Sequence, residues 1–300
     1  MLEEHLLNFK TVEAEDVPRL RSYIEKRPKR ICDFTAGCIY MWGQYYATAY
    51  ALDENALYLR VEYSAGYCYA ILPVSGSYIQ SVENLYKRCQ DDCRPLKLCA
   101  VIKEEYEALA KHFGARISAS TRRNWSDYVY LAEAMREFSG KKYHRQRNHI
   151  NAFIRDNPDW RFEPIGKSNF NDVVSFYDEY RKKYQKEATS ALVEAKAVNT
   201  VLSTYDKLDL PGGILYVGDE VVGFSIGEVS GDTLFVHIEK ASTEYRGSYQ
   251  MLVREFAREY AKDPVIYINR EDDAGDEGLR ASKLSYRPIE LIDKYLIAIE

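Results

Sequence analysis

The 300-residue sequence lacks long apolar runs, and this absence excludes several classes of protein. No stretch approaches the ~18 apolar residues that suggest a membrane-spanning helix. The first residues, MLEEHLLNF, are acidic and short in apolar side chains, unlike a secretory signal peptide. The net charge is only −5, which gives no overall attraction to nucleic acid or anionic lipid. We therefore expect a cytoplasmic protein without an integral membrane segment, whose contacts with polyanions need a local basic patch.

Cysteine pairs with metal-binding spacing are also missing. The six cysteines lie in the first half of the chain without a CxxC pair, and no histidine cluster accompanies them; their positions are 32, 38, 68, 89, 93 and 99. This pattern predicts free thiols and no metal site. The 26 tyrosines are an unusually large number. Because tyrosine fills cores as well as polar clefts, that number does not choose between functions.

The sequence does contain a faint internal repeat. FKTVEAEDVPRLRSYIEK (9–26) predicts a short strand and then a helix, with Asp16 as its N-cap and Pro18 in its first turn. FEPIGKSNFNDVVSFYDEYRKKY (162–184) repeats that order. A β-hairpin follows in each half, because β-rich segments flank turn-forming centres at 53–55 and 218–220.

The sharpest correspondence lies at a strand-to-helix corner in each half. SGSYIQSVENLYKRC begins at Ser75 and RGSYQMLVREFAREY begins at Arg246, so that Gly-Ser-Tyr recurs at 76–78 and 247–249. An apolar strand, a helix and a last apolar stretch follow each corner. Both halves thus have the order β-α-β-β-β-α-β-α-β, which predicts an α/β layer architecture made by duplication.

Between the halves lies EFSGKKYHRQRNHINAFIRDNPDW (137–160), a basic segment with helical spacing of its apolar residues. We interpret it as a helix that bridges two domains. The expected organisation is an N-terminal domain over residues 1–130, a bridging helix over 131–158 and a C-terminal domain over 159–300. The corner at Gly76 has a serine where the second corner has Arg246. The first half is therefore expected to be a non-catalytic partner, with the active site in the second.

Three segments carry a family resemblance: GKKYHRQRNHINAF (140–153), LFVHIEKASTEYRGSYQ (234–250) and YINREDDAGDEGLRASKLSYRP (267–288). With them the chain resembles the bacterial family built around the C-terminal domain of phosphatidylglycerol lysyltransferase, the aminoacyl-phosphatidylglycerol synthases. The resemblance implies two tandem GCN5-related N-acetyltransferase-like (GNAT-like) domains, each a mixed central sheet flanked by helices. It also implies acyl or aminoacyl transfer, with aminoacyl-tRNA as a donor, as in the related Fem peptidyltransferases.

The second corner departs from the motif that acetyltransferases use to bind the pyrophosphate of acetyl-CoA. That motif is Arg/Gln-x-x-Gly-x-Gly/Ala, and with Arg246 in its first position the two small positions become Tyr249 and Met251. A helix N-terminus still offers unpaired N–H groups to an anion, so we expect Arg246, Gly247, Ser248 and Tyr249 to bind the donor. The bulky residues favour a donor other than acetyl-CoA, or a corner kept only for structure. No cofactor is firmly implied beyond acyl-CoA or aminoacyl-tRNA as the donor substrate.

Candidate catalytic groups lie on a predicted strand and in the loop after the next strand. His237 and Glu239 share one strand face, because side chains alternate, and either of them is placed to accept a proton from an attacking amine or hydroxyl. NREDDAGDEGLRASK follows a buried strand, and that edge of an α/β sheet usually holds ligands. It supplies Glu271 and Asp272 as further bases, Asn269 and Arg270 as substrate-binding residues, and Lys283, which by the resemblance lines the donor side. The structural alternatives are a buried hydrogen-bonded pair, a solvated acidic loop and an exposed helix lysine.

The basic segment 141–155 is the only local patch suited to tRNA or an anionic head group, through Lys142, Arg145 and Arg147; a solvated bridging helix is the alternative. These observations favour an aminoacyltransferase acting on a small-molecule or lipid head-group acceptor. The alternatives are an acyl-CoA-dependent N-acyltransferase and a non-catalytic binding protein with a vestigial site.

Overall fold

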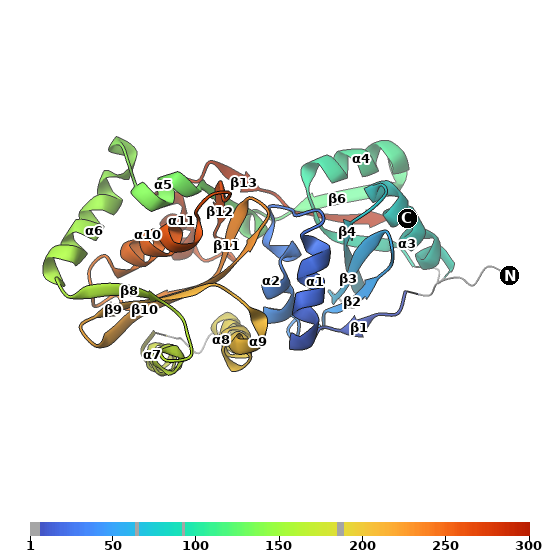
Figure 1. Cartoon of the computed structure of the whole chain (residues 1–300). Coiled ribbons are helices and arrows are strands. Elements are labelled where there is room, and N and C mark those ends of the chain that lie inside the picture. Colours follow the sequence, from blue (N-terminus) through green and yellow to red (C-terminus); the bar gives the residue numbers. More distant parts are fainter. Residues whose placement is uncertain (1–6, 64–65, 92–93, 185–188) are drawn as a thin grey trace. The chain divides into compact units, whose positions relative to one another are not determined.

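A computed structural model describes residues 7–63, 66–91, 94–184 and 189–300 and divides the chain into two compact units. The first unit combines Met1–Ser126 with Ile292–Glu300, and the second is Asp127–Leu291. Each unit contains one seven-stranded mixed sheet flanked by helices (Figure 1). The expected α/β class, with two tandem acetyltransferase-like domains, is confirmed.

The sheet of the first unit has the strand order β1-β2-β3-β4-β5-β14-β6. Its strands are β1 (Lys10–Thr11), β2 (Ala49–Leu52), β3 (Ala56–Glu62), β4 (Tyr67–Pro73), β5 (Leu96–Val101), β6 (Ile117–Thr121) and β14 (Tyr295–Ile299). Its helices are η1 (Ala14–Asp16), α1 (Val17–Ile24), η2 (Cys32–Phe34), α2 (Ala36–Met41), α3 (Tyr78–Asp91), α4 (Lys103–Phe113), η3 (Gly114–Arg116) and η4 (Arg123–Trp125). Helices α3 and α4 pack on the sheet through a core that includes Tyr58, Val82 and Leu109.

The sheet of the second unit has the strand order β13-β7-β12-β11-β10-β9-β8. Its strands are β7 (Asp127–Leu131), β8 (Trp160–Pro164), β9 (Gly212–Val217), β10 (Glu220–Ser230), β11 (Thr233–Ala241), β12 (Tyr267–Asn269) and β13 (Glu290–Ile292). Its helices are α5 (Ala132–Glu137), η5 (Lys141–Tyr143), α6 (His144–Asp156), α7 (Phe170–Tyr184), α8 (Thr189–Ser203), α9 (Tyr205–Leu208), α10 (Ser248–Tyr260) and α11 (Glu277–Ser285). Helices α10 and α7 cover opposite faces of this sheet (Figure 1).

The two sheets repeat one topology, which supports the expected duplication. Read from the first strand of each, they run β1-β2-β3-β4-β5-β14-β6 and β8-β9-β10-β11-β12-β7-β13. In each sheet the fourth and fifth strands, β4 with β5 and β11 with β12, pair in parallel. The strand inserted between the fifth and the last comes from the other half of the sequence: β14 completes the first sheet, and β7 the second. The two halves therefore exchange one strand.

This exchange changes the expected domain boundaries at 130 and 158. Strand β7 belongs to the second unit because Tyr267, Ile268 and Asn269 of β12 pair with it, and the last nine residues belong to the first unit because β14 pairs with β5 and β6. The segment 131–158 is also not a bridge. Its helices α5 and α6 pack against α10, and Ile150 and Phe153 enter the same core as Phe256.

Both hairpins and both corner helices form as expected, whereas α2, α8 and α9 are additional helices before the hairpins. Five cysteines are free thiols, at positions 32, 38, 68, 89 and 99, while Cys93 and residues 1–6 lie outside the described residues. Within the described ranges, no helix has both the length and the apolar character needed to cross a bilayer.

Candidate active site

Strands β11 and β12 separate near the middle of the second sheet. They pair in parallel only from Thr233 with Tyr267 to Phe235 with Asn269, where β12 ends and β11 continues to Ala241. The pairing of β11 with β10 also shifts register: Ile226 lies opposite Ile238, whereas the next residue lies opposite Val236. His237 is therefore the extra residue of a β-bulge. Bulges re-aim side chains and are common beside active sites.

The side chain of His237 is buried between two carboxylates. It is 2% exposed, and its Nδ1 lies 2.8 Å from Glu271 Oε1, while its Nε2 lies 3.5 Å from Glu228 Oε2. Burial opposes the charged imidazolium, but the two carboxylates outweigh it and raise the pKa of His237 to about 9. The histidine is therefore protonated at neutral pH, and the proton-accepting groups of this cluster are carboxylates. Glu228 was missed by the sequence analysis, although a carboxylate in the apolar strand FSIGEV is an available signal.

Arg270 and Glu239 form a second buried ion pair next to this histidine. Arg270 Nη2 donates to Glu239 Oε1 at 2.5 Å, and the two side chains are 8% and 13% exposed. The guanidinium also lies 4.5 Å from the centre of the Tyr286 ring and 5.9 Å from that of Tyr130. A charged group in such a site is stable only when paired. The pair therefore fixes the orientation of the Glu239 carboxylate.

The loop after β12 is held rigidly by its own polar contacts. Lys283 donates to the backbone carbonyl of Arg270 at 2.5 Å and to that of Asp272. Asn269 accepts from the Glu271 N–H at 2.7 Å and donates to Asp127 at 2.8 Å. Burial lowers the pKa of Lys283, and its ammonium group is engaged by the two carbonyls. Lys283 and Asn269 thus position Glu271, whose φ of 56° is unusual for a residue with a side chain.

Asp272 and Asp273, two aspartates of the same loop, both make contacts that hold the loop in shape. The Asp272 carboxylate accepts from the Ala274 N–H at 2.9 Å and so caps a turn. Asp273, which the sequence analysis passed over, is fully buried and binds Arg280 at 2.8 and 2.9 Å and the Tyr128 hydroxyl at 2.6 Å. The Arg280 guanidinium holds the pKa of Asp273 well below its usual range. These contacts fasten the loop to α11 and β7.

At the second corner, three of the four expected donor-binding residues make internal contacts. A Cβ on Gly247, whose φ is 89°, would lie 2.2 Å from the His149 backbone oxygen, so the glycine is required for the close approach of α6. Ser248 donates to the Ser242 carbonyl at 2.6 Å. The Tyr249 hydroxyl lies 3.1 Å from that of Tyr180, and burial together with Tyr180 raises its pKa well above the usual range. Arg246 alone is exposed.

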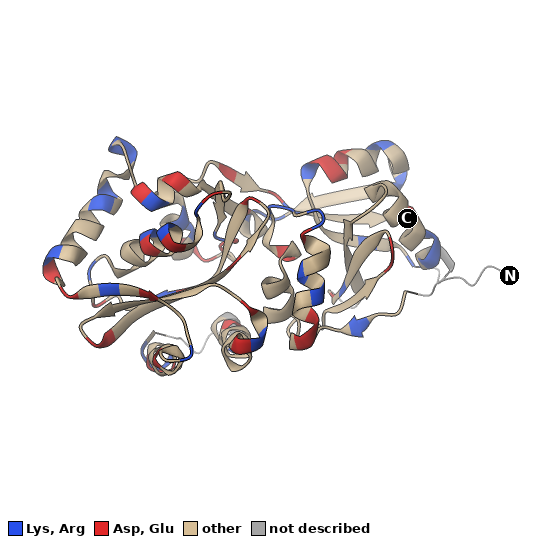
Figure 2. Cartoon of the chain, in the orientation of Figure 1, with Lys and Arg blue, Asp and Glu red and all other residues tan. Residues whose placement is uncertain are grey.

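Of the three basic residues near helix α6 that were expected to bind substrate, one makes internal contacts and two are exposed. Arg147 donates to the carbonyls of Phe138 and Gly140, and so closes the end of α5. Lys142 and Arg145 are exposed. Burial and the charges of Arg145 and Arg246 lower the pKa of His149. Figure 2 shows several basic positions along α6, coloured blue.

Comparison with known proteins shows the family and the fold of this chain. The model of the family described as "Phosphatidylglycerol lysyltransferase, C-terminal" matches residues 25–298. A conserved protein of unknown function from Bacteroides thetaiotaomicron is 29% identical, with a TM-score of 0.90 over 98% of this chain and 100% of that chain. The C-terminal domain of a putative lysylphosphatidylglycerol synthetase from Agrobacterium fabrum is 13% identical, with a TM-score of 0.68 over 95% of this chain and 91% of that one. An uncharacterized protein of Mycoplasmoides gallisepticum is 26% identical over 74% of this chain and 68% of its own length. The family match and the fold together support an acyl or aminoacyl transferase.

Proposed function

Because the chain belongs to the phosphatidylglycerol lysyltransferase C-terminal family, we propose that it transfers an amino acid from aminoacyl-tRNA to an amine or hydroxyl acceptor. The observation that carries the proposal is the charged cluster where β11 and β12 part. It consists of two buried pairs, His237 with Glu271 and Arg270 with Glu239, and Arg270 and Glu271 are neighbours in the loop after β12. Charged groups are costly to bury, so a cluster of this kind at a strand split favours a catalytic role over a purely structural one.

In the proposed reaction, Glu271 is the general base. The acceptor nitrogen or oxygen attacks the ester carbonyl of the aminoacyl group, and a new C–N or C–O bond forms. The bond between that carbonyl carbon and the ribose oxygen of tRNA breaks. The proton passes from the acceptor to Glu271 and then to the departing ribose oxygen, so no covalent enzyme intermediate is needed. The imidazolium of His237 orients Glu271 and balances its charge.

The donor is proposed from the corner and from helix α6. Tyr249 and the fully buried Met251 occupy the two positions where an acetyl-CoA site needs small residues, which disfavours a pyrophosphate there. The exposed Arg145 and Arg246, both of which lie near His149, offer phosphate contacts. Beyond Phe235, β11 has no pairing with β12 in the described part of the chain, so its amides on that edge can donate to an acyl carbonyl.

The proposal is tested by incubating the protein with total tRNA charged with labelled amino acids, together with a lipid extract and, separately, a pool of small amines. We expect label to leave the tRNA and appear in an acceptor fraction, and Glu271→Gln to prevent this transfer. Glu133→Gln, an exposed carboxylate on α5, is the matched control and should transfer normally. Transfer from acetyl-CoA but not from tRNA would replace this proposal with acyl-CoA chemistry. Activity with neither donor would favour the non-catalytic alternative.

A further inference from the structure

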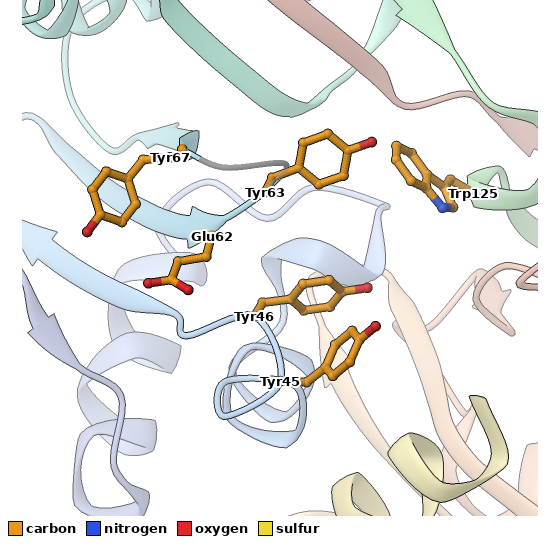
Figure 3. Close-up of a pocket in the computed structure, with 7 residues that line it drawn as sticks. Tyr45, Tyr46, Glu62, Tyr63, Tyr67 and Trp125 are labelled. Carbon is orange, nitrogen blue, oxygen red and sulfur yellow. The ribbon is translucent and has the colours of Figure 1, made fainter. Parts of the chain in front are cut away.

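The first unit contains a cavity of about 880 Å³ lined mainly by aromatic side chains (Figure 3). It is formed by Tyr45, Tyr46, Glu62, Tyr63, Gly66, Tyr67 and Trp125. Glu62 is the one charged residue among them. The proposed transfer in the second unit uses none of these groups, so the inference drawn from them stands independently of that function.

The walls of this cavity are held in place by backbone contacts and ring contacts. The Glu62 N–H donates to the Tyr46 carbonyl at 2.9 Å, which ties the segment after α2 to the end of β3, and the Tyr63 N–H donates to the Gly66 carbonyl at 2.9 Å. The rings of Tyr45 and Tyr46 meet edge to face at 4.7 Å, and Tyr63 meets Trp125 in the same way at 6.1 Å. The cavity is therefore a built feature of three chain segments.

Three of its five aromatic side chains are exposed, while Tyr63 and Trp125 are half-buried. Tyr45 is 59% exposed, Tyr46 42% and Tyr67 38%. Grouped exposed aromatic surface marks a binding site more often than an idle surface. Two rings of the cavity already attract cations of the chain itself: the guanidinium of Arg60 lies 4.5 Å from the Tyr67 ring centre, and that of Arg122 lies 4.6 Å from the Trp125 ring centre.

We propose that this cavity binds a trimethylammonium group, the cation of choline-like compounds. Aromatic faces attract a cation through their quadrupole, and the group formed by Tyr45, Tyr46, Tyr63 and Trp125 suits a quaternary ammonium ion, with Glu62 nearby as the one carboxylate (Figure 3). Such an ion has no N–H groups, so it loses little hydrogen bonding on leaving water. A primary ammonium needs several acceptors in compensation, and a metal ion needs several oxygen or nitrogen ligands. The lining residues provide one carboxylate and otherwise only neutral tyrosine hydroxyls as side-chain acceptors, a set that suits the first ligand better than the other two.

The volume leaves room for a further substituent on the cation. Cavities of ~300–1,000 Å³ accommodate drug-sized ligands, which exceed a trimethylammonium group alone. Both a free choline-like solute and a phosphocholine head group fit this description. In the second case the exposed Arg122 at the rim is available to the phosphate.

The test is isothermal titration of the full-length protein with choline, phosphocholine and 3,3-dimethylbutanol, a neutral molecule with nearly the shape of choline. We expect saturable binding of choline or phosphocholine and at least tenfold weaker binding of the neutral compound. Binding of choline identifies a free cation as ligand, and binding of phosphocholine alone identifies a head group. No saturable binding of either compound, or equal binding of the neutral one, would overturn the proposal.

Substitutions of residues that line the cavity test whether the ligand binds there. Glu62→Gln and Trp125→Leu should each weaken binding at least fivefold, whereas Glu54→Gln, an exposed carboxylate in the β2–β3 turn, should leave it unchanged. Because the Glu62 side chain is exposed, its replacement should not alter the melting temperature, and so folding cannot account for its effect. Unchanged affinity in both Glu62→Gln and Trp125→Leu would also contradict the assignment.

Discussion

The fourth strands of the two sheets, β4 and β11, occupy equivalent places but differ in regularity and in chemistry. Strand β4 pairs with β3 without interruption from Ala56 with Pro73 to Glu62 with Tyr67, and its end is the apolar run Ala-Ile-Leu-Pro. Strand β11 carries a bulge at His237 and then Glu239. The first half thus keeps the strand as a part of the core, while the second uses it to present ionisable groups.

An equivalent position near the end of the fifth strand, Ala100 in β5 and Glu271 just beyond β12, repeats this contrast. Gly76 and Gly247 are 171 positions apart (247 − 76), and so are Ala100 and Glu271 (271 − 100). Both Ala100 and Glu271 have positive φ, 53° and 56°. The backbone shape is therefore the same in both halves, whereas the carboxylate exists only in the second. The first unit also has a buried ion pair, Lys29 with Glu105 at 2.6 Å, but its carboxylate comes from helix α4.

The largest difference between the halves should appear in transfer activity. Glu271→Gln removes the proposed base while preserving the shape of the side chain, so we expect the rate to fall by about 10²- to 10³-fold. Glu105→Gln, the carboxylate of the ion pair in the first unit, should keep the wild-type rate per folded molecule. Rates are measured at saturating charged tRNA. A large loss in Glu105→Gln alone would move the active site to the first unit.

Replacing either buried cation, Arg270 or Lys29, should lower the free energy of unfolding by a similar amount, but the two replacements should affect the transfer rate differently. Arg270→Met and Lys29→Met each leave a buried carboxylate without its partner, and we expect each to lower the free energy of unfolding by about 4 kcal/mol. Of the two variants, only Arg270→Met should also lower the transfer rate per folded molecule, because it releases Glu239. Urea denaturation gives the stabilities. Equal activity of the two variants would remove the proposed role of the Arg270–Glu239 pair.

The pH dependence of stability should carry a contribution from His237 that the first unit lacks. The folded-state pKa of about 9 lies above the ordinary value of 6.5, so the folded protein holds a proton that the unfolded chain has released. This stabilisation is complete below pH ~6.5 and is lost as the pH rises through 9; a shift of ~2.5 units corresponds to about 3 kcal/mol. The difference in unfolding free energy between wild type and His237→Gln should shrink by about that amount between pH 6.5 and 10. A constant difference would mean that His237 is neutral when folded.

Replacing the two corner glycines with alanine should lower the stability by different amounts, and this is a smaller difference between the halves. Gly76→Ala places a methyl group with only the flexible Gln80 side chain within 4 Å, so we expect a loss of about 1 kcal/mol from its φ of 69°. Gly247→Ala adds the collision with the His149 carbonyl, and we expect about 3 kcal/mol. Thermal denaturation measures both. Equal losses would show that α6 yields to the added methyl group.

Local patterns in the sequence predicted the hairpins and the corner helices, whereas the bulge at His237 interrupts the alternation from which a shared face with Glu239 was expected. The exchange of β7 and β14 was not predictable in this way, because short strands at the ends of each half gain their partners from distant residues. Gly247 suggested an anion site, but its contact with His149 shows a packing requirement that no local pattern contains. Lys283 and Arg147 were similarly expected to face a substrate. Their partners are backbone carbonyls, which leave no mark in the sequence.

The central claim is that the donor binds where β11 and β12 part. Hydrogen–deuterium exchange with a stable amide-linked analogue of the aminoacyl-adenosine end of tRNA tests it most directly. The account predicts slower exchange in peptides covering 236–250 and 267–276, and no change in the equivalent peptides covering 70–80 and 96–103. Protection confined to the first unit, or its absence from both, would contradict it.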